Sequence, residues 1–348
     1  MRNYHSEIVQ ALRGGRPEYV PFTFYDTILP SSINRVELQE KGLAICARRD
    51  VFRTVMRDVD VKRVKEDDGS VRTIYSTPFG SVNQRSRPDA YGSVLMAPVE
   101  HFIKGRDDYL IAEFIVKNTY YEPIYDFFLN ERSSIGDRGY TLCQTCYSPF
   151  IDIQISWVGQ EQFCYELADN WDAIMGLYEI MRKKQREMYQ VVAESPAEYV
   201  LYGGNIVPEM IGPARVRDFI LPCWENFAQL LHEKGKKLGV HLDADNRLLL
   251  DIVKQSPLDF VEAFTPPPDC SVSVREARSA WPEKTLWINF PSSVHIRDDA
   301  VIEKTTRELL EDAGQRNGFL MGITEDIPHE HIERSVSIIL KVIEEHRS

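Results

Sequence analysis

The apolar positions of the chain fall into short segments that alternate with longer amphipathic ones. Five apolar segments are too short for helices and predict buried strands. They lie at residues 199–202, 237–242, 260–264, 286–289 and 318–321. Between and after them, apolar residues recur at helical spacing. These amphipathic segments predict helices at residues 171–193, 213–233, 274–280 and 300–312, and a final helix that ends at Glu345.

Strands and helices that alternate at this spacing predict a parallel sheet, and about eight such units predict an α/β fold, a single (β/α)8 TIM-type barrel. At the start of the chain, the pattern predicts a helix at residues 6–13, a strand at 19–25 and a helix at 36–48. No internal repeat or linker interrupts the sequence. We therefore expect one domain over residues 1–348.

Residues 59–83 follow a different pattern, in which apolar and polar residues alternate on both sides of the turn at residues 67–70. Strict alternation around a turn that contains Asp and Gly is typical of an antiparallel hairpin. We expect this segment to be a β-hairpin insertion that lies outside the barrel wall.

Charge and composition restrict the class of protein. The formal net charge is -12 and no long basic segment offsets it, which argues against nucleic acid as a partner. No apolar segment approaches the roughly 20 residues that cross a bilayer. The polar first ten residues lack the apolar core of a signal peptide. We therefore expect a cytoplasmic protein that does not contact membranes.

The cysteines are scattered, which fits reduced thiols better than a disulfide framework. They are Cys46, Cys143, Cys146, Cys164, Cys223 and Cys270. Cys143 and Cys146 form one Cys-x-x-Cys pair, and a single pair is weak support for a zinc site. We interpret it as the edge of a strand and as a secondary source of ligands.

The strongest candidates for functional residues lie at the end of the strand predicted at residues 237–242. His241 and Asp243 are two residues apart in an extended segment, so their side chains point to the same side. The carboxyl ends of parallel strands are where barrels place their sites. The alternative is a buried histidine followed by a helix-capping aspartate. We favour a functional role for His241 and Asp243, and a structural role for Asp245.

Other candidates follow predicted strands, and each has a structural alternative. Asp26 follows the first strand and is a candidate substrate-binding residue, or equally well a turn residue. Tyr202 and Asn205 flank the strand end near Gly203 and Gly204, where the absence of side chains lets a ligand approach the backbone. We take both as candidate catalytic residues.

Three further polar residues complete the set of candidates. Asn289 ends a strand and is a candidate catalytic residue, or it satisfies a loop. Glu209 and Asp269 are candidate substrate-binding residues, and each is otherwise a capping or solvent-facing residue. Three histidines lie in polar segments that predict exposed positions, and none of them is a candidate: His295, His329 and His331.

Several motifs together resemble the uroporphyrinogen decarboxylase superfamily, which includes porphyrin decarboxylases and cobalamin-dependent methyltransferases. The resemblance covers most of the chain, is strongest from Tyr199 onward and implies a single TIM-type barrel. The residues that carry it are Ala11-Leu12-Arg13-Gly14, Arg16-Pro17, Val20-Pro21-Phe22, residues 75–80, Gly203-Gly204-Asn205, residues 235–241, Ile288-Asn289 and residues 318–328.

The chain is closer to the methyltransferase branch of that superfamily. Porphyrin decarboxylases carry an Arg-Gln-Ala-Gly-Arg-Tyr segment that binds substrate carboxylates, and nothing like it follows Asp26. The methyltransferases hold zinc with a His-x-Cys and a later Cys. His241 matches that histidine, while Asp243 and Glu325 stand where the two cysteines would be. All three residue types bind metals, and this harder set also suits divalent ions other than zinc.

The resemblance thus implies an enzyme, a metal-dependent methyltransferase. It would move a methyl group between a small methylated substrate, as donor or acceptor, and a corrinoid bound to a partner protein. Loss of the metal together with the cysteines is an alternative. A second alternative is a lyase that decarboxylates a small carboxylic acid, which Arg or Lys residues near His241 would favour. A third is a non-catalytic ligand-binding barrel, which separation of His241, Asp243 and Glu325 would favour.

Overall fold

The computed structural model describes residues 2–88 and 96–347, and the chain divides into two compact units. The first unit comprises Met1–Asp50, Asp126–Thr145 and Pro196–Ser348, and the second comprises Val51–Tyr125 and Cys146–Ser195. The single domain expected over residues 1–348 stays a prediction. Each unit is described separately below.

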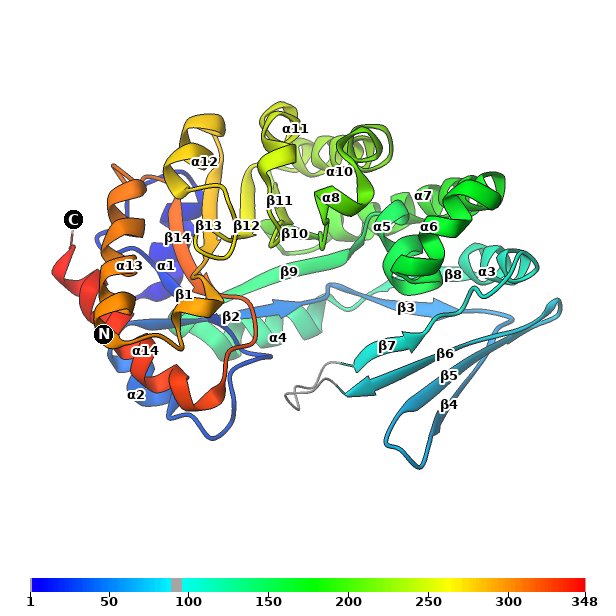
Figure 1. Cartoon of the computed structure of the whole chain (residues 1–348), viewed down its shortest axis with the longest axis horizontal. Helices are drawn as coiled ribbons and strands as arrows, with labels where there is room; N and C mark the ends of the chain where they lie inside the picture. Colours follow the sequence, from blue (N-terminus) through cyan, green and yellow to red (C-terminus); the bar gives the residue numbers. More distant parts are fainter. Residues whose placement is uncertain (1, 89–95, 348) are drawn as a thin grey trace. The chain divides into compact units, whose positions relative to one another are not determined.

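Eight strands of the first unit form a closed barrel in the order β1-β14-β13-β12-β11-β10-β9-β2 (Figure 1). They are β1 (Phe22–Tyr25), β2 (Leu43–Arg49), β9 (Gly139–Tyr147), β10 (Tyr199–Gly203), β11 (Lys237–His241), β12 (Phe260–Phe264), β13 (Thr285–Asn289) and β14 (Phe319–Ile323). The barrel closes because β1 pairs in parallel with both β14 and β2. The expected TIM-type α/β barrel is therefore confirmed.

One helix precedes β1, and others lie between and after the barrel strands. They are α1 (Tyr4–Leu12), α2 (Arg35–Glu40), α4 (Tyr125–Ile135), α8 (Pro208–Ile211), α9 (Pro213–Arg215), α10 (Leu221–Glu233), α11 (Leu250–Gln255), α12 (Val274–Ala280), α13 (Asp299–Asp312) and α14 (His329–Glu345). The longest of them bury an apolar face and expose a polar one. In α14, the buried face includes Ile332, Val336 and Ile339.

The helix expected at residues 36–48 is wrong over its second half. Helix α2 ends at Glu40, Gly42 has a φ of 122°, and the chain continues as the barrel strand β2. The five residues from Leu43 to Ala47 are buried, and β2 pairs with β1 and β9. In a short, wholly apolar segment, periodicity cannot distinguish a buried strand from a buried helix. Pairing with the neighbouring strands therefore decided the structure of this segment.

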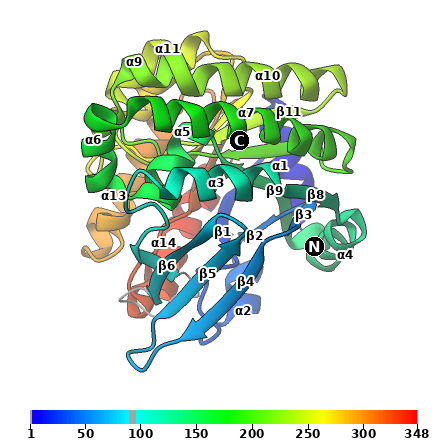
Figure 2. The ribbon, with the colours of Figure 1, turned by 90° about the vertical axis from the view of Figure 1, so that its right-hand side faces the viewer.

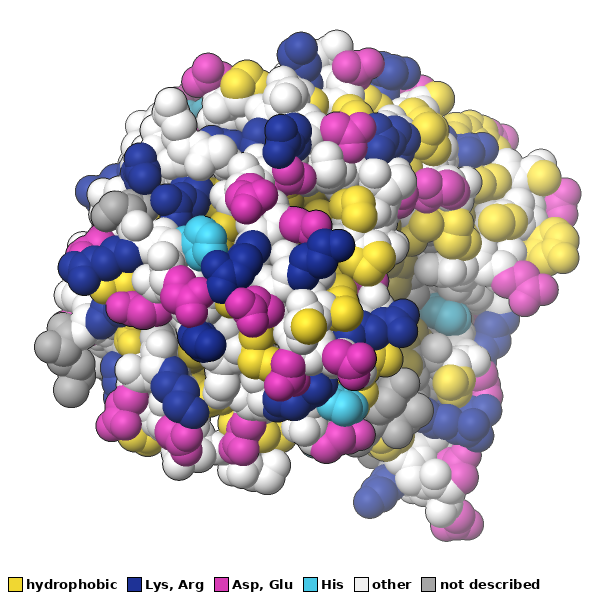
Figure 3. Space-filling view, turned by 60° about the vertical axis from the view of Figure 1, so that its left-hand side comes forward, with side chains coloured by type: hydrophobic (Ala, Val, Ile, Leu, Met, Phe, Trp, Pro, Cys, Tyr) yellow, Lys and Arg dark blue, Asp and Glu magenta, His cyan; other side chains and the backbone are white. Residues whose placement is uncertain are grey.

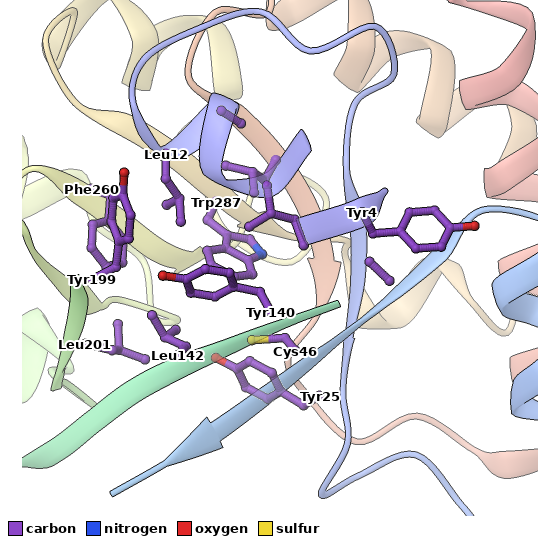
Figure 4. Close-up of a cluster of buried hydrophobic side chains, with 14 residues drawn as sticks. Tyr4, Leu12, Tyr25, Cys46, Tyr140, Leu142, Tyr199, Leu201, Phe260 and Trp287 are labelled. Atoms are coloured by element: carbon purple, nitrogen blue, oxygen red, sulfur yellow. The ribbon is translucent and has the colours of Figure 1, made fainter. Parts of the chain in front are cut away.

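Apolar and aromatic side chains form a buried cluster inside the barrel, where they lie against one another (Figure 4). Tyr140, Tyr199, Phe260 and Trp287 contribute from four strands, and Leu12 of α1 packs against them from the end of the barrel. A Cβ at residue 239 would lie 2.2 Å from the ring of Phe260, so Gly239 leaves the space that this ring occupies. His241 and Asn289, by contrast, are the last residues of their strands.

The second unit contains the antiparallel strands (Figure 2). Strands β4 (Asp60–Lys65), β5 (Val71–Thr77), β6 (Gly80–Pro88) and β7 (Met96–Glu100) form one sheet, and β3 (Phe52–Met56) pairs with β8 (Thr119–Pro123). The pairing of β4 with β5 corresponds to the expected hairpin, and it lies outside the barrel wall. The antiparallel region extends well beyond residues 59–83, because neighbouring strands complete the sheet.

The remaining helices of the second unit are α3 (Asp108–Lys117), α5 (Pro149–Asp152), α6 (Gln160–Asp169) and α7 (Trp171–Glu194). Arg72 and Arg85 tie the four-stranded sheet together through Glu100, at 3.0 and 2.8 Å. Within the described residues, we find no helix with the length and apolarity that a membrane crossing requires.

The surface carries both signs of charge. On the face shown in Figure 3, Lys and Arg side chains are interspersed with Asp and Glu. Ion pairs such as Arg275–Asp312 and Arg307–Glu303, at 2.8 and 2.7 Å, are typical of this arrangement. That face therefore lacks the extended basic surface that nucleic-acid binding requires.

Candidate metal centre

The position of His241 is fixed by the strand that carries it and by a neighbouring glycine. His241 is the last residue of β11 and is buried, with 8% of its surface exposed. Gly204 follows the adjacent strand β10, and a Cβ there would lie 1.5 Å from the carbonyl oxygen of His241. Only glycine permits this approach, so Gly204 allows the backbones of the two strand ends to pack closely at the histidine.

Two carboxylates face the Nε2 atom of His241. Asp243 Oδ2 lies 3.6 Å from it and Glu325 Oε1 lies 4.0 Å from it. One ligand atom from each of the three residues lies within 4.8 Å of the others. The structure thus brings together the three residues proposed as ligands, although Glu325 is far from the other two in sequence. Their role as metal ligands stays a prediction.

The other ring nitrogen of His241 contacts a carboxylate that the sequence analysis missed. Nδ1 lies 2.7 Å from Oε2 of Glu262, whose side chain is fully buried. His241 and Glu262 are register partners on β11 and β12. The other carboxylate oxygen of Glu262 accepts a hydrogen bond from the hydroxyl of Tyr25. A charged residue inside the otherwise apolar segment of residues 260–264 was the available signal.

Electrostatics at the cluster favour a cation. Burial lowers the pKa of His241, but Glu262 and Asp243 outweigh burial and raise it to about 10. Burial and the charge of Asp243 raise the pKa of Glu325 to about 7, while His241 acts in the opposite direction. In the absence of a metal ion, a proton on His241 therefore compensates the surrounding carboxylates.

Arg48 brings a second positive charge to the same end of the barrel. It lies on β2, and its guanidinium carbon is 3.8 Å from the centroid of the Tyr25 ring. Glu262 and Glu325 are among the charges that raise its pKa against the effect of burial. Arg48 was not among the predicted site residues because the sequence pattern predicts a helix over this segment.

The donor set fits a divalent ion. One imidazole nitrogen and two carboxylates form a three-residue set that leaves coordination positions open. Metal–nitrogen and metal–oxygen bonds of about 2 Å require ligand atoms roughly 3–4 Å apart. The separations of 3.6 and 4.0 Å from His241 meet that requirement with small side-chain movements. Glu262 fixes the ring so that Nε2 faces the two carboxylates.

Two other predicted site residues, Asn289 and Asp269, accept hydrogen bonds from neighbouring loops. Asn289 is buried, and its Oδ1 accepts a hydrogen bond of 3.0 Å from the backbone amide of Thr324, the residue before Glu325. Asp269 is exposed, and its carboxylate accepts from the amide and hydroxyl of Ser293. Asn289 therefore orients the segment that carries Glu325.

Asp26 pairs with an arginine at the neighbouring strand end. Its two carboxylate oxygens lie 3.2 and 2.5 Å from the Nη1 and Nη2 atoms of Arg49. Arg49 also donates from Nε to Glu131 at 2.6 Å. The contacts of Asp26 thus join β1 to β2.

The three candidate residues at and after the end of β10 differ in their exposure to solvent. Tyr202 is fully buried, and its ring packs edge-on against Phe227 of α10 at 5.8 Å, on the helix side of the strand. Asn205 is exposed with a φ of 50°, and Glu209 is exposed in the first turn of α8. Glu209 is not among the carboxylates that lie around His241, and the catalytic roles of Tyr202 and Asn205 stay predictions.

Asp245 has the structural role that the sequence analysis favoured. Its carboxylate accepts from the amide of Arg247 at 3.0 Å and from the amide of Ser271 at 2.9 Å. These bonds tie the loop after β11 to the loop after β12.

Comparison with known proteins supports the fold. No protein-family profile matches the chain, and no curated protein sequence matches it. Among solved structures, a methyltransferase from Methanosarcina mazei is 11% identical, with 99% of each chain covered and a TM-score of 0.58. A B12-independent methionine synthase from a Shewanella species is 10% identical over 89% of this chain and 85% of that one, with a TM-score of 0.47. At these identities, the first similarity shows that this chain shares the barrel fold of the methyltransferase, and the second is too low to add to it.

Proposed function

We propose that this protein is a metal-dependent methyltransferase that moves a methyl group between a small methylated substrate and a corrinoid carried by a partner protein. The observation that carries the proposal is the convergence of His241, Asp243 and Glu325 at the carboxyl end of the barrel. The shared fold of the Methanosarcina mazei methyltransferase supports it.

The chain's own residues would prepare the site for such a reaction. Asp243 and Glu325 would supply negative charge to a divalent ion, zinc or a harder metal, and His241 would supply a nitrogen. Bound there, the ion would act as a Lewis acid on an oxygen or sulfur of the substrate. Glu262 and Tyr25 hold the imidazole in one orientation, and Asn289 holds the segment that carries Glu325.

The first test is metal binding. Elemental analysis of purified protein should find about one divalent ion per chain, and competition with a chromophoric chelator should give its affinity. The variant His241→Ala should lose most of this affinity. His232 contacts Asp259 at 2.7 Å and lies outside the cluster, so His232→Ala is the matched control and should bind metal like the wild type.

The second test is methyl transfer itself. Free cob(I)alamin replaces the corrinoid protein, and methanol, dimethyl sulfide and methoxyacetate serve as methyl donors. Metal-loaded wild-type protein should form methylcobalamin from at least one donor, and His241→Ala should not. A wild-type protein that binds no divalent ion, or a His241→Ala variant that retains full activity in metal-free buffer, would contradict the proposal.

A carboxy-lyase is the second candidate, and Arg48 is the observation that favours it. A guanidinium beside the cluster is suited to a carboxylate substrate. This reaction would release carbon dioxide from a small carboxylic acid in metal-free protein, with no methylcobalamin formed. Measurement of both products from the same incubation separates the two candidates.

A further inference from the structure

We propose that Arg48, held on the ring of Tyr25, is the anion-binding group of this site and that the substrate is a small molecule with a carboxylate. The inference deepens the proposed function, on which it rests, by naming the chemical class of the substrate. It depends on the placement of two adjacent arginines, Arg48 and Arg49.

The two arginines point to opposite sides of β2, because successive side chains of a strand alternate. Arg49 is satisfied by the carboxylates of Asp26 and Glu131, at 2.5 and 2.6 Å. Arg48 is on the same side as Ala44 and Cys46, which belong to the barrel interior. One arginine therefore connects structural elements, and the other faces the interior, where the cluster lies.

Arg48 lacks the partners that its neighbour has. Its Nε atom is buried and has no hydrogen-bond partner within residues 2–88 and 96–347. No ion pair joins its guanidinium to a carboxylate among the described residues, even though Glu262 and Glu325 act on it electrostatically. A buried donor without a partner carries a free-energy cost, which a bound acceptor would remove.

Tyr25 makes this arrangement rigid. Its ring supports the guanidinium at 3.8 Å, while its hydroxyl donates to Glu262, which in turn contacts His241. The same side chain therefore sets the position of the cation and of the imidazole. The guanidinium group is planar and presents its N–H groups as a fork. This fork matches the two oxygens of a carboxylate.

The geometry consequently assigns two parts of a substrate to two parts of the site. The carboxylate would bind Arg48, and the rest of the molecule would extend toward His241, Asp243 and Glu325. A small acid of this kind fits a single arginine, whereas a polycarboxylate requires several.

The test measures binding of methoxyacetate, a methyl ether with a carboxylate, by isothermal titration calorimetry. Methoxyacetamide is its neutral analogue, and methyl phosphate and methanesulfonate represent other anions. The wild type should bind methoxyacetate more tightly than the three analogues. Arg48→Met should weaken methoxyacetate binding by about 10- to 100-fold, because a charged bidentate contact is lost. Equal affinity for methoxyacetate and methoxyacetamide, or tighter binding of either other anion, would overturn the assignment.

Three variants keep the test decisive. Arg275→Met removes an equal charge from an exposed ion pair with Asp312 and should leave methoxyacetate binding unchanged. Arg48→Lys keeps the charge without the planar fork and should bind methoxyacetate several-fold more weakly than the wild type. If circular dichroism shows that Arg48→Met does not fold, the methoxyacetate affinity of Arg48→Lys decides whether Arg48 binds the carboxylate. An Arg48→Lys variant with wild-type affinity, or a folded Arg48→Met with wild-type affinity, would overturn the inference.

Metal binding separates this inference from the proposed function. Each titration is made with metal-free and with zinc-loaded protein. If the wild type binds no zinc, the proposed function fails, and methoxyacetate binding to the metal-free protein still decides the role of Arg48. If zinc binds both wild type and Arg48→Met while their methoxyacetate affinities are equal, the role of Arg48 fails and the metal site stands.

Discussion

The Nδ1 atom of His241 lies 2.7 Å from the Oε2 atom of Glu262, on the neighbouring strand of the barrel. The pair is buried, and the hydroxyl of Tyr25 donates to the second oxygen of the same carboxylate. The orientation of the histidine is thus determined by residues of two other strands. Carboxylates in this position commonly orient a metal-binding imidazole and raise its basicity.

Glu262→Gln tests this relationship. The amide keeps the shape of the side chain but removes the charge that orients and polarises the imidazole. We expect metal affinity to fall by about 10- to 100-fold. Chelator competition measures metal affinity, and the control is Glu303→Gln, a partly exposed residue whose carboxylate pairs with Arg307. Wild-type metal affinity in Glu262→Gln would show that His241 does not depend on this carboxylate.

The two carboxylates of the cluster should behave differently from Asp245, which lies in the same loop as Asp243. Asp243→Ala and Glu325→Ala should each lower metal affinity strongly, while the unfolding temperature of the metal-free protein changes little. The fold should survive because the barrel core buries most of the apolar surface. Asp245→Asn is the matched control, since Asp245 bonds to Arg247 and Ser271 instead. An Asp245→Asn variant that loses as much metal affinity as Asp243→Ala would contradict the proposed ligand set.

Gly204→Ala should damage the site through the backbone. The added methyl group would overlap the carbonyl oxygen of His241, so either β10 or β11 has to shift. We expect a loss of unfolding free energy of about 1–3 kcal/mol or more, together with weaker metal binding. Chemical denaturation and chelator competition measure the two effects. Gly105→Ala, where no heavy atom lies within 4 Å of the added Cβ, is the control.

His295 should make the protein less stable in acid. The polar sequence around His295 predicts an exposed position, but the side chain is fully buried, with Nδ1 2.9 Å from Ser335 Oγ. Burial lowers its pKa to about 3, with Asp269 and His331 acting in opposite directions. Below the unfolded pKa of about 6.5, the unfolded chain binds a proton that the folded protein excludes, so stability falls as pH decreases toward 3.

The measurement is the free energy of unfolding of wild type and His295→Asn between pH 7 and pH 4. The wild type should lose up to about 1.4 kcal/mol per pH unit more than the variant. The difference between the slopes of unfolding free energy against pH gives the contribution of His295, because the other titrating groups are the same in both proteins. Parallel slopes would show that His295 is not kept neutral in the folded protein.

The sequence by itself determined the positions of most elements and the identity of the proposed ligands. The segment at residues 260–264 is the strand β12, and residues 274–280 are the helix α12, because each shows a period or length typical of one structure. His241 and Asp243 followed from the two-residue spacing at a strand end. Glu325 followed from the resemblance to the methyltransferases.

Only the tertiary structure decided which residues surround those ligands. The parallel register of β11 and β12 pairs His241 with Glu262, and no local pattern encodes the register of strands that are far apart in sequence. Arg48 was missed because a short apolar segment, without a helical or strand period, was taken for a helix. Its place beside Tyr25 depends on β2 joining the barrel, so long-range pairing and not local propensity put the second cation at the site.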